Sequence, residues 1–209
     1  MASPRTSRPV TLWDPVVRVT HWAVAGIVLA NAFLTRGGSV PHVALGWALM
    51  GLLALRLVWG VLGPAEARFS AFPPNPLAAL RHIRALFFGK VREHPSHNPA
   101  GALVIYAFWA ALAAMVATGL ALTGGATPMQ IAADKAAVAS GDWSALIKDS
   151  EDTPETEDTS LRHTVEEIHE MTSTLLLFLA ALHLAGVLIE SRALRRNLVA
   201  PMLLGSRRK

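Results

Sequence analysis

Four long apolar stretches dominate the pattern of hydrophobic and polar positions along this chain of 209 residues. They cover roughly residues 16–35, 42–63, 101–124 and 166–190, and charged segments separate them. A helix rises about 1.5 Å per residue, so each stretch can cross a hydrocarbon layer of about 30 Å. None of the stretches alternates polar and apolar residues as a barrel strand does. Because only helices and closed barrels span lipid, the pattern predicts an all-α membrane protein, a four-transmembrane-helix bundle.

A shorter segment between the second and third stretches has a different pattern. Leu80, Ile83 and Phe87 recur at helical spacing, and Arg81 and Arg84 lie between them. An apolar face beside a basic face is typical of a helix that lies on a membrane surface. We therefore predict a short amphipathic helix over residues 76–87.

Composition supports a membrane protein and limits its redox chemistry. Hydrophobic residues make up 52% of the chain and charged residues 16%, below the roughly 25% of a soluble domain. The net charge of +4 indicates basic loops at a membrane surface rather than nucleic-acid binding. No cysteine is present, which excludes disulfides, cysteine-bound iron–sulfur clusters and covalently attached haem. Any redox centre must therefore be held by histidine.

The distribution of Lys and Arg predicts the orientation. The N-terminal segment, the loop of residues 64–100 and the C-terminal segment are basic, whereas residues 125–167 contain three basic and ten acidic side chains. Positive loops stay on the cytoplasmic side. We expect a bacterial inner-membrane protein with both termini cytoplasmic and an acidic periplasmic loop over residues 125–165. The middle of that loop is expected to be solvated.

The first apolar stretch has an alternative interpretation as a signal peptide. Ala30-Asn31-Ala32 has the small-residue pattern of a cleavage site after an apolar run. No basic segment directly precedes the run, and cleavage would discard His21, so a retained span is the preferred interpretation.

Four of the eight histidines lie in or at the rim of the predicted spans: His21, His42, His169 and His183. Ionisable groups inside a membrane are costly and usually functional. His169 and His183 are 14 residues apart, which on a helix is about 40° short of four turns and a rise of about 21 Å. They face one direction at different depths, so they belong to separate metal sites.

The predicted topology pairs these histidines by depth. His21 lies in the inner half of the membrane with His183, and His42 lies in the outer half with His169. Each pair predicts one haem with two imidazole ligands, which leaves no position for oxygen chemistry and suits electron transfer. The fold class is therefore a bundle that encloses two b-type haems.

Three arginines and five glycines are secondary candidates. Arg18 and Arg56 lie near the inner pair and Arg36 near the outer pair, where they either bind haem propionates or extend to the membrane surface. The glycines either leave room for flat haems or allow close helix packing. They are Gly26, Gly46, Gly51, Gly119 and Gly186.

The other four histidines, His82, His94, His97 and His163, fall in loops or at interfaces and are expected to be solvated. Histidines inside a membrane also serve as interhelical hydrogen-bond partners or as sites in a haem-free transporter or metal permease. Four histidines at matching depths on three helices favour haem.

Five segments carry a resemblance to a known family. They are residues 13–22 (WDPVVRVTHW), 42–46 (HVALG), 56–60 (RLVWG), 97–101 (HNPAG) and 167–187, which contains His169 and His183. They resemble the bacterial di-haem cytochrome b561 family, most closely the b-type cytochrome subunits related to nickel-iron hydrogenases. The resemblance implies a single cytochrome b membrane domain over residues 1–209, with His21, His42, His169 and His183 as haem ligands.

The resemblance also implies a quinone-reactive electron carrier. Its electron donor in the family is a hydrogenase small subunit, a small cytochrome c or superoxide. The acidic run of residues 149–158 favours a basic periplasmic redox protein as the partner, and ubiquinone or menaquinone is expected at the inner haem. A self-contained superoxide:quinone oxidoreductase is the alternative, although an acidic outer loop repels an anion.

Overall fold

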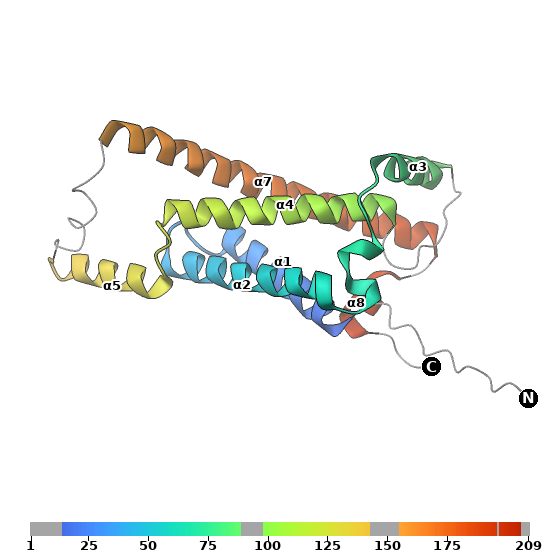
Figure 1. Cartoon of the computed structure of the whole chain (residues 1–209), viewed down its shortest axis with the longest axis horizontal. Coiled ribbons are helices and arrows are strands. Elements are labelled where there is room, and N and C mark those ends of the chain that lie inside the picture. Colours follow the sequence, from blue (N-terminus) through green and yellow to red (C-terminus); the bar gives the residue numbers. More distant parts are fainter. Residues whose placement is uncertain (1–13, 89–97, 143–154, 196, 206–209) are drawn as a thin grey trace, which may run out of the picture. The chain divides into compact units, whose positions relative to one another are not determined.

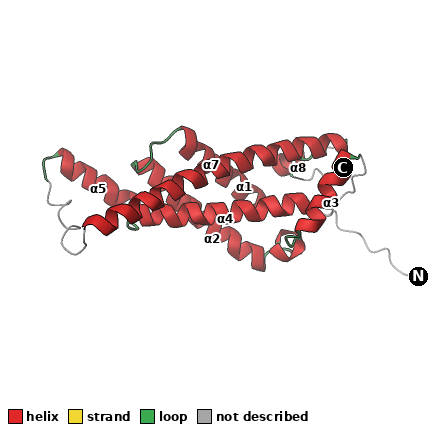
Figure 2. Ribbon diagram, turned by 90° about the horizontal axis from the view of Figure 1, so that it is seen from above, coloured by secondary structure: helices red, strands yellow, loops and turns green. Residues whose placement is uncertain are grey.

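The computed structural model describes residues 14–88, 98–142, 155–195 and 197–205, and over these residues it contains helices, turns and loops but no strand (Figure 2). Figure 1 colours the elements in chain order, from blue at the N-terminus to red at the C-terminus. They are α1 (Pro15–Phe33), α2 (Val40–Leu62), the 3-10 turns η1 (Ala65–Ala67) and η2 (Phe69–Ala71), α3 (Pro76–Phe87), α4 (Pro99–Leu122), α5 (Pro128–Ala139), α7 (Glu155–Ala193) and α8 (Val199–Leu204).

Four helices are long and apolar enough to cross a membrane: α1, α2, α4 and the part of α7 from Thr159 to Ala193. This confirms the all-α fold with four spans. The ends of α1, α2 and α4 fall within two residues of the predicted stretches. Only 6% to 17% of the residues in their most apolar windows are buried, as expected when lipid contacts the outward side chains.

The region between α4 and α7 contains more helix than the sequence pattern predicted. α5 occupies residues 128–139, and α7 begins at Glu155, eleven residues before the predicted fourth stretch. Hydropathy marks the part of a helix that contacts lipid, and the first turns of α7 are polar. Residues 149–154 of the acidic run lie outside the described residues, and residues 155–158 form the first turn of α7.

Four helices begin with a polar residue followed by proline. Asn98, for example, accepts a hydrogen bond from the backbone N–H of Gly101 at 2.6 Å. Such a side chain accepts a hydrogen bond from a backbone N–H group in the first turn of the helix. Proline fits at the first helical position because the backbone N–H that it lacks would have no partner there. The four pairs are Asp14-Pro15, Asn75-Pro76, Asn98-Pro99 and Thr127-Pro128.

The chain divides into two compact units, and α1, α2, α4 and α7 each contribute residues to both. The first unit comprises residues 1–22, 56–106 and 181–209, and the second comprises residues 23–55 and 107–180. Each unit is described separately below.

Leucine and alanine side chains from three helices form the core of the second unit. Val24, Ile27 and Val28 of α1 pack against this core. The buried members are Leu49 and Leu53 of α2, Ala111 and Leu112 of α4, and Leu176 and Leu179 of α7. Spacings of four and three residues place the α2 pair and the α7 pair each on one helix face, and the adjacent Ala111 and Leu112 of α4 complete a seam between helices.

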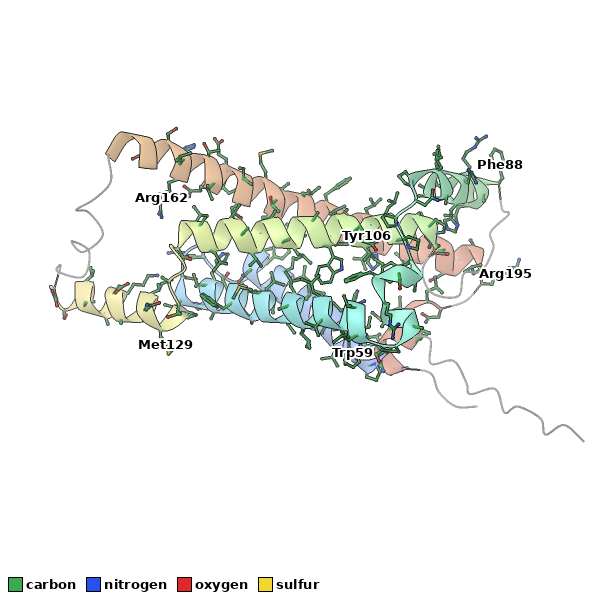
Figure 3. All side chains as sticks on the ribbon, in the orientation of Figure 1. Trp59, Phe88, Tyr106, Met129, Arg162 and Arg195 are labelled. Carbon is green, nitrogen blue, oxygen red and sulfur yellow. The ribbon has the colours of Figure 1, made fainter. Side chains whose placement is uncertain are left out.

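In the first unit, a hydrogen bond joins the start of α1 to the end of α2. The indole N–H of Trp59, labelled in Figure 3, donates to Asp14 Oδ1 at 2.9 Å. The same oxygen accepts from the backbone N–H of Val16 at 2.8 Å and begins α1. Asp14 therefore fixes both the start of α1 and its attachment to α2.

An aromatic cluster fills the space beside the end of α2. The rings of Phe69 and Phe72 lie 6.3 and 6.1 Å from the ring of Tyr106, which Figure 3 labels on α4. The Tyr106 hydroxyl donates to the carbonyl oxygen of Phe69 at 3.3 Å. A side chain on Gly60 would collide with the Phe69 ring, so glycine is required there for η2 to pack against α2.

The predicted amphipathic helix over residues 76–87 is confirmed as α3. Leu77, Leu80 and Ile83 are exposed, as expected for side chains that contact lipid, whereas Ala79 is buried. The prediction that His82 is solvated was wrong, because His82 is only 6% exposed. Its ring lies on the buried face of α3, which the spacing of the leucines alone did not reveal.

Candidate functional site

His42 of α2 and His169 of α7 face each other in the second unit. Their ring centroids are 6.3 Å apart, and the ring planes make an angle of 63°. Both side chains are partly buried. Ser39 accepts a hydrogen bond from the backbone N–H of His42 at 3.4 Å and begins α2, which places His42 in its first turn.

A hydroxyl group on α4 orients the imidazole of His169. Thr118 Oγ1 lies 2.8 Å from His169 Nδ1 and 2.8 Å from the carbonyl oxygen of Ala114. The hydroxyl donates its proton to that carbonyl oxygen, so its oxygen accepts from His169 Nδ1–H. Nε2 of His169 then carries the lone pair that binds a metal.

A second hydroxyl group orients His42 in the same way. Thr35 Oγ1 lies 3.2 Å from His42 Nδ1 and 3.1 Å from Asn31 Oδ1, to which it donates. The Asn31 amide also donates to the carbonyl oxygen of His42 at 3.2 Å. In both histidines of this pair, a hydroxyl at Nδ1 thus leaves Nε2 as the nitrogen available to bind a metal.

Glycines border this pair. A Cβ atom on Gly119 would lie 3.5 Å from His169 Cε1, and one on Gly46 would meet no described atom within 4 Å. Gly46 follows His42 by four residues, so both lie on one face of α2. The two glycines therefore add no side-chain bulk beside the pair.

His21 of α1 and His183 of α7 form the second pair, in the first unit. Their ring centroids are 6.2 Å apart, with an angle of 54° between the planes. The ring of Trp22 meets the His21 ring edge-on at 5.1 Å. His21 Nδ1 is buried and has no hydrogen-bond partner among the described residues.

The spacing of both pairs fits a shared metal ion. Two imidazoles that bind one metal from opposite sides, each through a bond of about 2.0 Å, hold their centroids roughly 6 Å apart. Across the described residues, no group of three or more His, Cys, Asp or Glu side chains is arranged to hold a metal ion. Two imidazoles alone are an incomplete ligand set, so the pairs fit a metal whose other ligands come from a macrocycle such as haem.

Comparison with known families identifies the cofactor class. A family model described as prokaryotic cytochrome b561 matches residues 12–205, almost the whole chain. The chain belongs to the prokaryotic cytochrome b561 family. Cytochromes of this family are membrane di-haem electron carriers with b-type haem, so the predictions of family and cofactor class are confirmed. No curated protein and no solved structure matches the chain.

The three predicted arginines have different surroundings in this cytochrome. Arg18 donates to the carbonyl oxygens of Met202 and Leu203 at 3.1 and 2.6 Å, and so holds α8. Arg36 is exposed in the turn between α1 and α2 and has no side-chain partner within the described ranges. Their role toward propionates stays a prediction.

Arg56 is the arginine that retains a free buried donor. Its Nη2 donates to the carbonyl oxygen of Ala67 at 3.1 Å, and its guanidinium lies 5.3 Å from the centre of the Phe69 ring. Its Nη1 is buried without a partner in the described part of the chain. The Nη1 amino group of Arg56 is therefore available for an anionic ligand group.

The sequence patterns missed the groups that support His42 and His169. Thr35, Asn31 and Thr118 were not predicted, although a hydroxyl residue seven positions before His42 was a weak signal. The hydrogen bond between Trp59 and Asp14 gives a structural role to two residues of the segments that carry the family resemblance. His163 is exposed as predicted, and His94 and His97 lie outside the described residues.

Proposed function

We propose that this cytochrome carries electrons between a periplasmic redox protein and the membrane quinone pool, with His21 and His183 holding one haem and His42 and His169 the other. The observation that supports the proposal is the presence of two imidazole pairs, at 6.2 and 6.3 Å, each drawn from two helices. A haem with two imidazole ligands supplies one-electron chemistry without an open position at the metal.

The protein side of this function is orientation of the ligands and exclusion of water. Thr118 and Thr35 keep the imidazoles of His169 and His42 in one tautomer, with Nε2 free to bind. The leucine and alanine core of the second unit packs in the same segments of α2, α4 and α7. An apolar, closely packed environment around a haem reduces the rearrangement of protein and solvent when the haem gains or loses an electron.

The proposed partners follow from charge. Both termini and residues 64–100 are assigned to the cytoplasm and residues 125–167 to the periplasm. A basic periplasmic redox protein, either a cytochrome c or a hydrogenase-like subunit, is the partner that the acidic run of residues 149–158 attracts. Ubiquinone or menaquinone approaches through lipid on the cytoplasmic side, where α3 exposes Leu77, Leu80 and Ile83.

Rapid mixing with each partner tests the proposal. A short-chain quinol is expected to reduce the haems of the wild-type protein in nanodiscs, and a reduced basic cytochrome c is expected to do so at a rate that falls as salt increases. Neutralising the run of residues 149–158 to Asn and Gln should slow the second reaction and leave the first unchanged.

The matched control changes two acidic residues outside that run, Asp134 and Asp142, to Asn. It should leave both rates near those of the wild type. Haem that no quinol reduces would contradict the quinone assignment. Rapid reduction by superoxide, with no reaction toward cytochrome c, would replace the proposed partner with superoxide.

A further inference from the structure

A polar cluster outside the histidine pairs joins three helices of the first unit. Glu190 near the end of α7 accepts a hydrogen bond from the amide of Asn98, the residue that begins α4. Its other carboxylate oxygen, Oε1, lies 3.8 Å from Nε2 of His82 on α3. The side chains of His82 and Glu190 are 4% and 13% exposed.

The surroundings make this cluster a place to hold a proton. A buried carboxylate is costly unless a donor or a positive charge accompanies it, and the His82 imidazole lies within ion-pair distance of Glu190. Among the described residues, His82 is the titratable group within ion-pair distance of Glu190. The arginines on α3 and around the end of α7 are exposed, and among the described residues no ion pair joins them to Glu190. They are Arg81 and Arg84 on α3, Arg192 at the end of α7, and Arg195, which Figure 3 labels.

Glu190 and His183 lie on one face of α7. Seven residues separate them, which on a helix is about 20° short of two turns and a rise of about 10.5 Å. One added electron at a metal bound to His183 changes the potential at Glu190. At about this distance, and at the effective dielectric constant of a partly buried site, that added charge would change the proton affinity of the Glu190 and His82 cluster on the order of tenfold.

We propose that Glu190 and His82 form a proton-binding site that takes up a proton when the haem at His21 and His183 is reduced. This inference rests on the proposed placement of that haem. A haem held by His21 and His183 would accept one electron from the redox partner, and one proton from the solvent would then join the Glu190 carboxylate or the His82 imidazole. No bond to the haem forms or breaks. Asn98 positions the carboxylate and keeps its geometry in both protonation states.

Redox titration at several pH values tests the proposal. For the wild type, the midpoint potential of one haem should fall as pH rises. The steepest slope possible for one proton per electron is a tenfold change in the equilibrium constant for reduction per pH unit, which is about 59 mV per pH unit. Glu190→Gln keeps the size and the hydrogen bond to Asn98 but cannot ionise, so the slope of that haem should disappear. His82→Gln should reduce the slope.

Two exposed residues provide matched controls. Asp134→Asn removes an acidic group on α5 and His163→Gln removes an exposed imidazole, and both should keep the wild-type slope. Reduced-minus-oxidised infrared spectra provide a second readout, in which a band of a protonated carboxyl group should be present in the wild type and lost in Glu190→Gln.

Two results would overturn the inference. A wild-type protein whose two midpoint potentials are both independent of pH would do so without any variant, even if Glu190→Gln failed to fold. A slope that persists unchanged in folded Glu190→Gln would assign Glu190 a structural role only. Both results are distinct from failure of the haem placement, in which His183→Ala would retain both haems.

Discussion

Thr118 on α4 and His169 on α7 are joined by a contact of 2.8 Å between Oγ1 and Nδ1. The contact fixes which nitrogen of His169 carries the proton, since the threonine hydroxyl already donates to the carbonyl oxygen of Ala114. A ligand imidazole whose Nδ1–H is donated to an acceptor is more basic and stabilises the oxidised metal. We therefore expect this single hydroxyl group to influence the redox potential of a haem bound to His169.

Replacing this hydroxyl should raise one midpoint potential. Thr118→Val keeps the shape of the side chain but leaves His169 Nδ1–H without its acceptor, at a cost of about 1–3 kcal/mol. The midpoint of the haem at His42 and His169 should rise, while the other haem should keep its value. Redox titration followed by visible absorption measures both. Thr118→Ser should restore the wild-type potential.

Thr123 supplies the control for this prediction. Its hydroxyl lies in the turn directly after α4 and donates to the carbonyl oxygen of Gly119, within α4, at 2.9 Å. Thr123→Val should leave both potentials unchanged. Equal shifts in Thr118→Val and Thr123→Val would attribute the effect to general disturbance of α4.

A large side chain at Gly46 should prevent binding of one haem while preserving the fold. A Cβ atom there meets no described atom within 4 Å, so the polypeptide leaves space for the first side-chain atom of Gly46→Leu. We expect about half of the wild-type haem in a pyridine haemochrome assay, with unchanged helical circular dichroism. Gly37→Leu, in the turn before α2, is the control and should bind the full amount. Full haem content in Gly46→Leu would remove that glycine from the site.

Loss of the anchor at Asp14 should destabilise the first unit. Asp14→Ala removes both the start of α1 and the acceptor for Trp59, whereas Asp14→Asn retains an oxygen for the helix start. Loss of a helix-capping side chain costs about 0.5–2 kcal/mol. The temperature at which haem absorption is lost should therefore decrease more in Asp14→Ala than in Asp14→Asn. Equal temperatures for wild type and Asp14→Ala would show that the anchor carries no stability.

The orientation can be measured because the chain contains no cysteine. Ser140 at the end of α5 and Ser70 in η2 are both exposed. A cysteine at position 140 should react with an impermeant thiol reagent in intact cells, and a cysteine at position 70 should react only in inverted vesicles. The reverse pattern would contradict the proposed orientation of both loops.

The sequence predicted the long helices well because lipid imposes a simple requirement on each of them. A span must be apolar over about 20 residues, and α1, α2 and α4 begin and end close to the predicted limits. α5 was missed because it is short and carries no strong apolar face. Thr127-Pro128-Met129-Gln130 was the available signal, since Thr127 and Gln130 form a capping box at its start.

The histidine pairs were predictable and their supporting groups were not. Spacing on one helix and charge in the loops placed His169 opposite His42 and His183 opposite His21, and the structure brings both pairs together. Contacts such as Thr118 with His169 join positions 51 residues apart, and no local pattern relates them. The burial of His82 was missed for the same reason, because its partner Glu190 is distant in sequence.

Haem content and visible spectra of four single histidine variants test the central claim most directly. The purified wild-type protein should contain two b-type haems per chain by pyridine haemochrome assay. Alanine at His21 or His183 should remove one spectral component, and alanine at His42 or His169 should remove the other. A wild type with one haem, or a folded variant that lacks any of these four histidines and still binds both haems, would contradict the assignment of the two pairs.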